Sequence, residues 1–136
     1  MNPQSEKSLE EVVCTSFVRV VQGRFAMIKV VELAVPTDCF LVTRDEDEVT
    51  AVIEEKMLAT VNYLDIQKWF KLIEIVVSVP FFTVGFIASV TTSLAQKGLN
   101  VLVISTFSKD YFMVREQKIA VATESLRELG FPISSG

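Results

Sequence analysis

The chain has 136 residues, of which 50% are hydrophobic and 22% charged. This composition is typical of one compact domain, or of two small ones sharing a core, and excludes a mainly disordered chain. Seventeen acidic residues against 13 basic ones give a net charge of −4, which argues against nucleic acid or anionic lipid as a partner. Because histidine is absent, Ser-His-Asp and Cys-His catalysis and every His-containing zinc site are excluded. We expect binding, regulation or assembly, no cofactor and no enzymatic activity.

Cysteine usage predicts a cytoplasmic protein with reduced thiols. Cys14 and Cys39 are too few for a disulfide framework and lack metal-ligand spacing. Residues 1–11 contain no apolar run like that of a secretory signal. Neither cysteine has an activating neighbour, so we expect both to be buried small hydrophobic residues.

One uncharged stretch, Ile75–Gln96, is long enough to span a bilayer. Pro80 and Gly85 interrupt it, however, and its second half carries a polar stripe at helical spacing. The stripe consists of Ser89, Thr92, Ser93 and Gln96. A buried strand followed by an amphipathic helix explains this pattern better than a membrane span.

The first half of the chain, residues 1–68, is predicted to be a strand-rich module. Residues 1–12 resemble a solvated leader that ends in a strand or a short helix. Val12–Val21 and Arg24–Val31 are rich in β-forming residues, and Gln22-Gly23 between them suggests a turn.

A hairpin follows, with Cys39–Thr43 and Val49–Ile53 as its strands. The tip, Arg44–Glu48, could be a cation site, but it lacks the ligand pattern of a calcium loop, and a solvated tip is favoured. Met57–Lys68 is ambiguous and is expected to be irregular or a single helical turn.

The second half, residues 69–136, alternates strands and helices. Glycines at 98 and 130 are expected to end the two helices in the left-handed conformation. The predicted elements are the strand Leu72–Val79, the helix Phe86–Lys97, the strands Val101–Ser105 and Tyr111–Arg115, the helix Ile119–Leu129 and a short last strand Phe131–Ile133. This order is the split β-α-β arrangement of α+β, ferredoxin-like folds. Because both helices then cover one sheet face, the other face should be covered by the first half or by another subunit, and we expect a homo-oligomer, most simply a dimer.

Three segments of this half resemble a known family. They are residues 84–90 (VGFIASV), 94–100 (LAQKGLN) and 104–114 (ISTFSKDYFMV). Together they resemble the ACT domain, a small regulatory ligand-binding module, and more narrowly the tandem ACT proteins that include cytosolic arginine sensors and bacterial homologues. The resemblance runs from about Trp69 to Phe131, and the first half resembles the degenerate, helix-poor ACT-like module that precedes it in such proteins.

The resemblance implies a non-catalytic sensor of a small molecule, most simply an amino acid, bound between ACT modules of one chain or of two. By position, Val84, Gly85 and Phe86 would provide backbone contacts. The opposite wall would be formed by Ser105, Thr106, Phe107 and Asp110.

The residues themselves allow this chemistry and simpler alternatives. Gly85 near a helix N-terminus would let a carboxylate approach bare backbone N–H groups, or it would only allow tight packing of helix on sheet. Asp110 would pair with an ammonium group, whereas Ser105 to Asp110 could also be an ordinary turn bonded to its own backbone. Lys109 could neutralise Asp110.

Other readings remain open at this stage. Phe81-Phe82 could form an apolar wall for a ligand, an oligomer contact or part of the core. Trp69 and Tyr63 are expected to be packing residues. The main competing function is an assembly module without a ligand, because an enzyme built on Asp110 would need a second converging acid that the sequence does not place.

Overall fold

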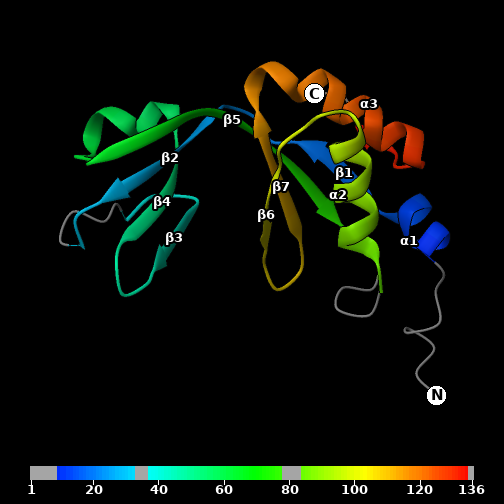
Figure 1. The fold of residues 1–136 in the computed structure, drawn as a ribbon, viewed down its shortest axis with the longest axis horizontal. Helices are drawn as coiled ribbons and strands as arrows, with labels where there is room; N and C mark the ends of the chain where they lie inside the picture. The colour runs from blue at the N-terminus through cyan, green and yellow to red at the C-terminus, as the bar shows by residue number, and fades with distance from the viewer. Residues whose placement is uncertain (1–8, 33–36, 78–83, 135–136) are drawn as a thin grey trace. The chain divides into compact units, whose positions relative to one another are not determined.

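The computed structural model describes residues 9–32, 37–77 and 84–134 (Figure 1). The described elements alternate between strands and helices and confirm the α+β fold class. In chain order they are α1 (Leu9–Thr15), β1 (Phe17–Val20), β2 (Phe25–Val30), β3 (Leu41–Arg44), β4 (Val49–Glu54), the 3-10 helix η3 (Glu55–Thr60), β5 (Asp65–Val76), α2 (Phe86–Gln96), β6 (Leu102–Ser105), β7 (Asp110–Arg115), the 3-10 helix η4 (Glu116–Lys118), α3 (Ile119–Leu129) and β8 (Ile133–Ser134).

The chain divides into two compact units, and the division is discontinuous. The inserted unit is Gly23–Lys71, and the discontinuous unit combines Met1–Gln22 with Leu72–Gly136. Strand β5 contributes its first part to the inserted unit and its second part to the discontinuous one. The sequence suggested a single boundary at 68/69. The observed division differs because β1 pairs antiparallel with the second part of β5, from Phe17 opposite Val76 to Val20 opposite Ile73.

The discontinuous unit has the predicted ferredoxin-like order of strand and helix, from β5 through α2, β6, β7 and α3 to β8. In its sheet β7 lies between β6 and β5, and β1 lies between β5 and β8. A short last strand was predicted at Phe131–Ile133; the observed strand is Ile133–Ser134, and it pairs in parallel with β1. The N-terminal strand therefore occupies the sheet position beside β5.

One hydrophobic core holds the helices of this unit against one face of its sheet. Val90 and Leu94 of α2 and Leu126 of α3 share the core with Ile73 and Ile75 of β5. Both long helices end at glycines with positive φ, as predicted: φ is +77° at residue 98 and +106° at residue 130. The buried apolar area on these helices supplies the main driving force for their docking.

The inserted unit contains the strand order β3-β4-β2-β5. The predicted hairpin is confirmed: β3 and β4 pair antiparallel, with Arg44 opposite Val49. At its tip, the carboxylate of Asp45 accepts hydrogen bonds from the backbone N–H groups of Asp47 (2.8 Å) and Glu48 (2.9 Å), which lower the pKa of Asp45. The acidic tip is thus organised as a turn, in agreement with the interpretation as a solvated tip.

Three local expectations need correction. Val12 and Val13 lie in the short helix α1, where they reach the core of the discontinuous unit, and not in a strand. Strand β5 begins at Asp65, within a stretch expected to be irregular. Cys14 is exposed and Cys39 half-buried, so the prediction that both are buried was wrong.

In the part of the chain that the structure describes, no helix is long and apolar enough to cross a membrane. Pro80, Phe81 and Phe82 lie outside the described residues.

Candidate functional site

The first group of predicted site residues lies at the start of α2. Gly85 is the N-cap residue, with φ +83° and ψ 1°, a left-handed conformation that favours glycine. Among the residues that the structure describes, a Cβ built on Gly85 would meet no atom within 4 Å, so this glycine is not required for tight packing of helix on sheet. Glycine suits this position because of its left-handed backbone conformation and because it leaves no side-chain bulk at the start of the helix.

The neighbours of Gly85 have opposite environments. Val84 is 95% exposed, whereas Phe86 is 5% exposed and its ring meets Phe131 edge-on, with 6.1 Å between centroids. Phe86 therefore anchors the first turn of α2 in the core. Gly85 provides no side-chain cap, and the helix begins with the bond from the N–H of Ser89 to the carbonyl of Gly85 (2.9 Å). The N–H groups of a first helical turn, together with the helix dipole, favour an anion.

The second group of predicted site residues forms the β6–β7 hairpin turn. The N–H of Thr106 donates to the carbonyl of Lys109 (2.8 Å), and the N–H of Lys109 donates to Oγ1 of Thr106 (3.1 Å). Beside the turn, the hydroxyl of Ser105 donates to Oδ1 of Asp110 (2.6 Å). Phe107 at the tip is 84% exposed. These bonds show that the segment is a self-bonded turn, which was the simpler of the two predicted alternatives for Thr106.

The two groups lie toward the same end of the discontinuous unit: α2 begins at the end to which the β6–β7 turn points (Figure 1). A surface pocket of about 430 Å³ lies beside Gly85. Its other lining residues are Ala88, Ser89, Thr92, Ser93, Gln96 and Leu129. This pocket therefore contains the polar stripe of α2 and none of the hairpin residues.

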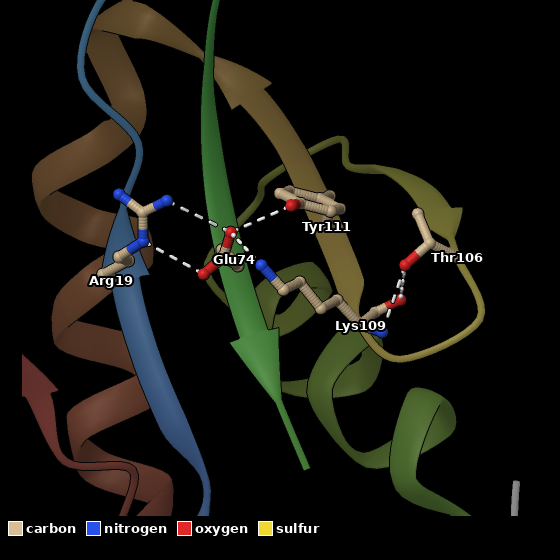
Figure 2. Close-up of polar contacts among 5 residues, drawn as sticks. All are labelled: Arg19, Glu74, Thr106, Lys109 and Tyr111. Atoms are coloured by element: carbon tan, nitrogen blue, oxygen red, sulfur yellow. Dashed lines mark hydrogen bonds and ion pairs between the residues drawn. The ribbon is translucent and has the colours of Figure 1, made fainter. Parts of the chain in front are cut away.

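Sequence reasoning missed a polar cluster around Glu74, shown in Figure 2. The Glu74 side chain is 8% exposed and its carboxylate accepts four hydrogen bonds. Arg19 donates from Nε to Oε1 (3.0 Å) and from Nη2 to Oε2 (3.3 Å). Oε2 also accepts from Nζ of Lys109 (3.3 Å) and from the hydroxyl of Tyr111 (2.9 Å). The cluster joins β1, β5 and the β6–β7 turn.

The cluster changes the ionisation of its members. Burial by itself raises the pKa of Glu74, but the hydrogen bonds from Arg19, Tyr111 and Lys109 outweigh it, and the net pKa is lowered. Burial and the bond to Glu74 raise the pKa of Tyr111 to about 12. The bond to Glu74 also raises the pKa of Arg19. Glu74 is therefore a carboxylate, and Arg19 a cation, at neutral pH.

Lys109 is directed to Glu74, although the sequence left open that it neutralises Asp110. Asp110 instead accepts a hydrogen bond from the hydroxyl of Ser105. The signal for the cluster was present in the sequence: Glu74 is the lone charged residue of the predicted strand Leu72–Val79, and a buried carboxylate needs partners.

The two aromatic residues expected to be packing residues differ: Tyr63 is 42% exposed, so that expectation was wrong for it, whereas Trp69 has a structural role. Trp69 packs against the core of the inserted unit, and the guanidinium of Arg24 lies 4.3 Å from its ring centroid. Among residues 9–32, 37–77 and 84–134, no group of three or more Cys, Asp or Glu side chains could hold a metal ion.

Comparisons with known proteins agree with this architecture. The sequence model of the ACT domain family matches residues 66–128, just under half of the chain. No curated protein gave a match. Among solved structures, a Vibrio cholerae protein described as being of unknown function and a possible transport protein has a TM-score of 0.78 at 23% identity, over 92% of this chain and 98% of that one.

Two further structures have the same fold. An Agrobacterium tumefaciens protein has a TM-score of 0.70 at 18% identity, over 88% of this chain and 92% of that one. The ligand-free regulatory subunit of aspartate kinase from Thermus thermophilus has a TM-score of 0.60 at 10% identity, over 87% of this chain and 99% of that one. At these identities the likeness shows the fold, an ACT-type ferredoxin-like arrangement.

Proposed function

We propose that this chain is a non-catalytic, cytoplasmic regulatory protein that binds an amino acid where two ACT modules meet. The match of residues 66–128 to the ACT family and the likeness to a regulatory subunit of aspartate kinase support a regulatory role. The observation that carries the proposal is the start of α2, where Gly85 is left-handed and a Cβ would meet no atom of the described residues within 4 Å.

Each end of an amino acid would have a partner. The ligand carboxylate would accept hydrogen bonds from the first-turn N–H groups of α2 beside Gly85. Its ammonium group would donate to Asp110, whose carboxylate is already held by the hydroxyl of Ser105 (2.6 Å). Val84, Phe86, Thr106 and Phe107 would complete the surroundings of the ligand. Because the ammonium group of Lys109 donates to Glu74, it need not compete with the ligand for Asp110.

A second module would close the site. The pocket beside Gly85 contains none of the hairpin residues, so a wall from another module is needed to enclose a ligand that touches both. We propose a homodimer as the arrangement that supplies it. Ligand binding would favour one arrangement of the modules through its higher affinity for that arrangement.

The test is a thermal-shift screen of the twenty amino acids at millimolar concentration, followed by calorimetry on each hit. A ligand at ~100 times its dissociation constant adds about 2.7 kcal/mol of stability, which is a readily measured shift. Asp110→Asn should weaken binding about tenfold or more, because it removes a charge-assisted hydrogen bond. Asp47→Asn, in the exposed β3–β4 turn, is the matched control and should bind as the parent does. Twenty amino acids without a shift would contradict the proposal.

The exposure of apolar side chains at this end of the unit supports a second candidate, an assembly module without a ligand. Val84 and Phe107 are 95% and 84% exposed, which suits a protein contact. The combined change Gly85→Val, Ser105→Ala and Asp110→Ala distinguishes the two. A changed oligomeric state in a protein for which no ligand is found would favour assembly.

A further inference from the structure

The sheet of the discontinuous unit has a second face, which turns away from α2 and α3. Val18, Ile73 and Phe112 point into the core that contains the helices. Because side chains alternate along a strand, Arg19, Glu74 and Tyr111 point to the opposite face. The register places Arg19 directly opposite Glu74 across the β1–β5 pair. The polar cluster of Figure 2 therefore belongs to this second face.

The cluster holds two cations against one anion. Nη2 of Arg19 and Nζ of Lys109 are each 3.3 Å from the same oxygen, Oε2 of Glu74, so they are separated by no more than twice that distance. The three ionised groups carry a net charge of +1, in a chain whose net charge is −4. Like charges this close repel each other, and a second anion between them would relieve the repulsion.

The two cations and the carboxylate differ in their exposure to solvent. The Arg19 and Lys109 side chains are 49% and 40% exposed, whereas Glu74 is 8% exposed. The positive groups therefore reach solvent and the negative one does not. Glu74 accepts two of the five N–H donors of the guanidinium and one of the three of the ammonium group, which leaves donors on both cations. Glu74 fixes the two side chains in advance, which reduces the entropy that a ligand must overcome.

An exposed aromatic side chain lies on the same strand as Arg19. Phe17 lies two residues before Arg19 on the same side of β1 and is 70% exposed. We infer that Arg19 and Lys109 form a binding site for an oxyanion, a carboxylate or phosphate group, carried on an apolar or aromatic body that lies over Phe17. This site is distinct from the proposed amino acid site, because Asp110 alternates with Tyr111 and belongs to the other face.

The test is an NMR titration of the ¹⁵N-labelled full chain with phenylphosphate, benzoate and inorganic phosphate. We expect saturable shifts of backbone amides in β1, β5 and β7, and tighter binding of the aromatic anions than of inorganic phosphate. The stronger of the two aromatic probes identifies the preferred group, phosphate or carboxylate. Phe17→Ala should remove the advantage of the aromatic probes and leave the affinity for inorganic phosphate unchanged.

Matched variants assign the binding to the two cations. Arg19→Gln and Lys109→Gln should each weaken binding about tenfold, because each removes a charge-assisted contact. Lys97→Gln is the control, since Lys97 forms an ion pair with Glu128 (3.2 Å) elsewhere on the same unit, and it should leave the affinity unchanged. If Arg19→Gln unfolds the chain, the test depends on Lys109→Gln, because that variant keeps the ion pair between Arg19 and Glu74.

Two results would overturn the inference. The first is an equal affinity of the parent, Lys109→Gln and Lys97→Gln, which would mean that the anions bind by unspecific attraction. The second is an apparent affinity that depends on protein concentration, which would assign this face to contact with another copy of the chain. A failed amino acid screen affects neither result, so the two proposals fail independently.

Discussion

Replacing Glu74 by Gln removes one negative charge from the centre of the polar cluster and keeps the size of the side chain. The parent carboxylate accepts from Arg19, Lys109 and Tyr111. Gln retains a single acceptor oxygen, and its NH₂ group faces the two cations as a donor. The substitution therefore tests whether the cluster stabilises the fold or contributes little to its stability.

The structure sets the expected size of the effect. Removing one partner of a fully buried ion pair costs about 3–5 kcal/mol. Arg19 and Lys109 are 49% and 40% exposed, however, so water replaces much of what they lose, and exposed pairs contribute only about 0–1 kcal/mol. Tyr111 is 8% exposed and would lose a charged acceptor, at about 1–3 kcal/mol. We expect a loss of about 2 kcal/mol in the free energy of unfolding at pH 7.

Urea denaturation of the parent and of Glu74→Gln as a function of pH is the assay. The pKa of Glu74 is lowered in the folded chain, so the carboxylate contributes stability above its unfolded pKa, about 4.3. That contribution is lost as the pH falls through the lower folded pKa, and the difference between the two proteins should shrink below pH 4. Glu128→Gln, an exposed partner of Lys97, should change stability by less than about 0.5 kcal/mol. A Glu74→Gln effect below about 0.5 kcal/mol at pH 7, or one that persists unchanged in acid, would refute the reasoning.

Three further outcomes follow from the same structure. In the Tyr63→Phe variant, Tyr111 is the remaining tyrosine. Its ultraviolet titration should have a midpoint near pH 12 in the folded protein and about 10 in urea. Equal midpoints would contradict the buried bond to Glu74. Leu94→Ala in α2 should lower the free energy of unfolding by about 2–5 kcal/mol in denaturant titrations, because Leu94 is fully buried in the core of the discontinuous unit; a loss below 1 kcal/mol would contradict that packing. A thiol reagent should modify exposed Cys14 faster than Cys39, whose pKa is raised chiefly by burial, and equal rates would contradict this difference.

Local patterns predicted the second half of the fold well. The amphipathic spacing of α2 and α3 and the glycines at 98 and 130 specify where each helix lies and where it ends, because helix periodicity and caps are short-range features. The β3–β4 hairpin was predictable for the same reason, since a charged turn joins two β-rich runs.

Long-range pairing was not predictable from local pattern. Strand β1 finds its partner in β5, and Arg19 and Glu74 are 55 residues apart in the chain. Nothing in the four residues of β1 indicates which strand they pair with, so the sequence suggested a contiguous first module. The sequence left a strand or a short helix open at the position of α1, because α1 is only seven residues long and its β-branched residues favour strands; burial of Val12 and Val13 stabilises the helix.

Two local features of the candidate site can be explained from residue types, while its role in ligand binding stays a prediction. The conformation of Gly85 and the turn at Thr106 follow from residue types with strong backbone preferences. The lone Glu74 in an apolar strand could have indicated buried cationic partners, but which cations reach it depends on the strand register.

A crystal grown with a mixture of amino acids tests the central proposal most directly. The proposal predicts ligand density with its carboxylate on the backbone beside Gly85 and its ammonium group within hydrogen-bond distance of Asp110. Density for a bound amino acid at any other place, with both of these positions vacant, would contradict it.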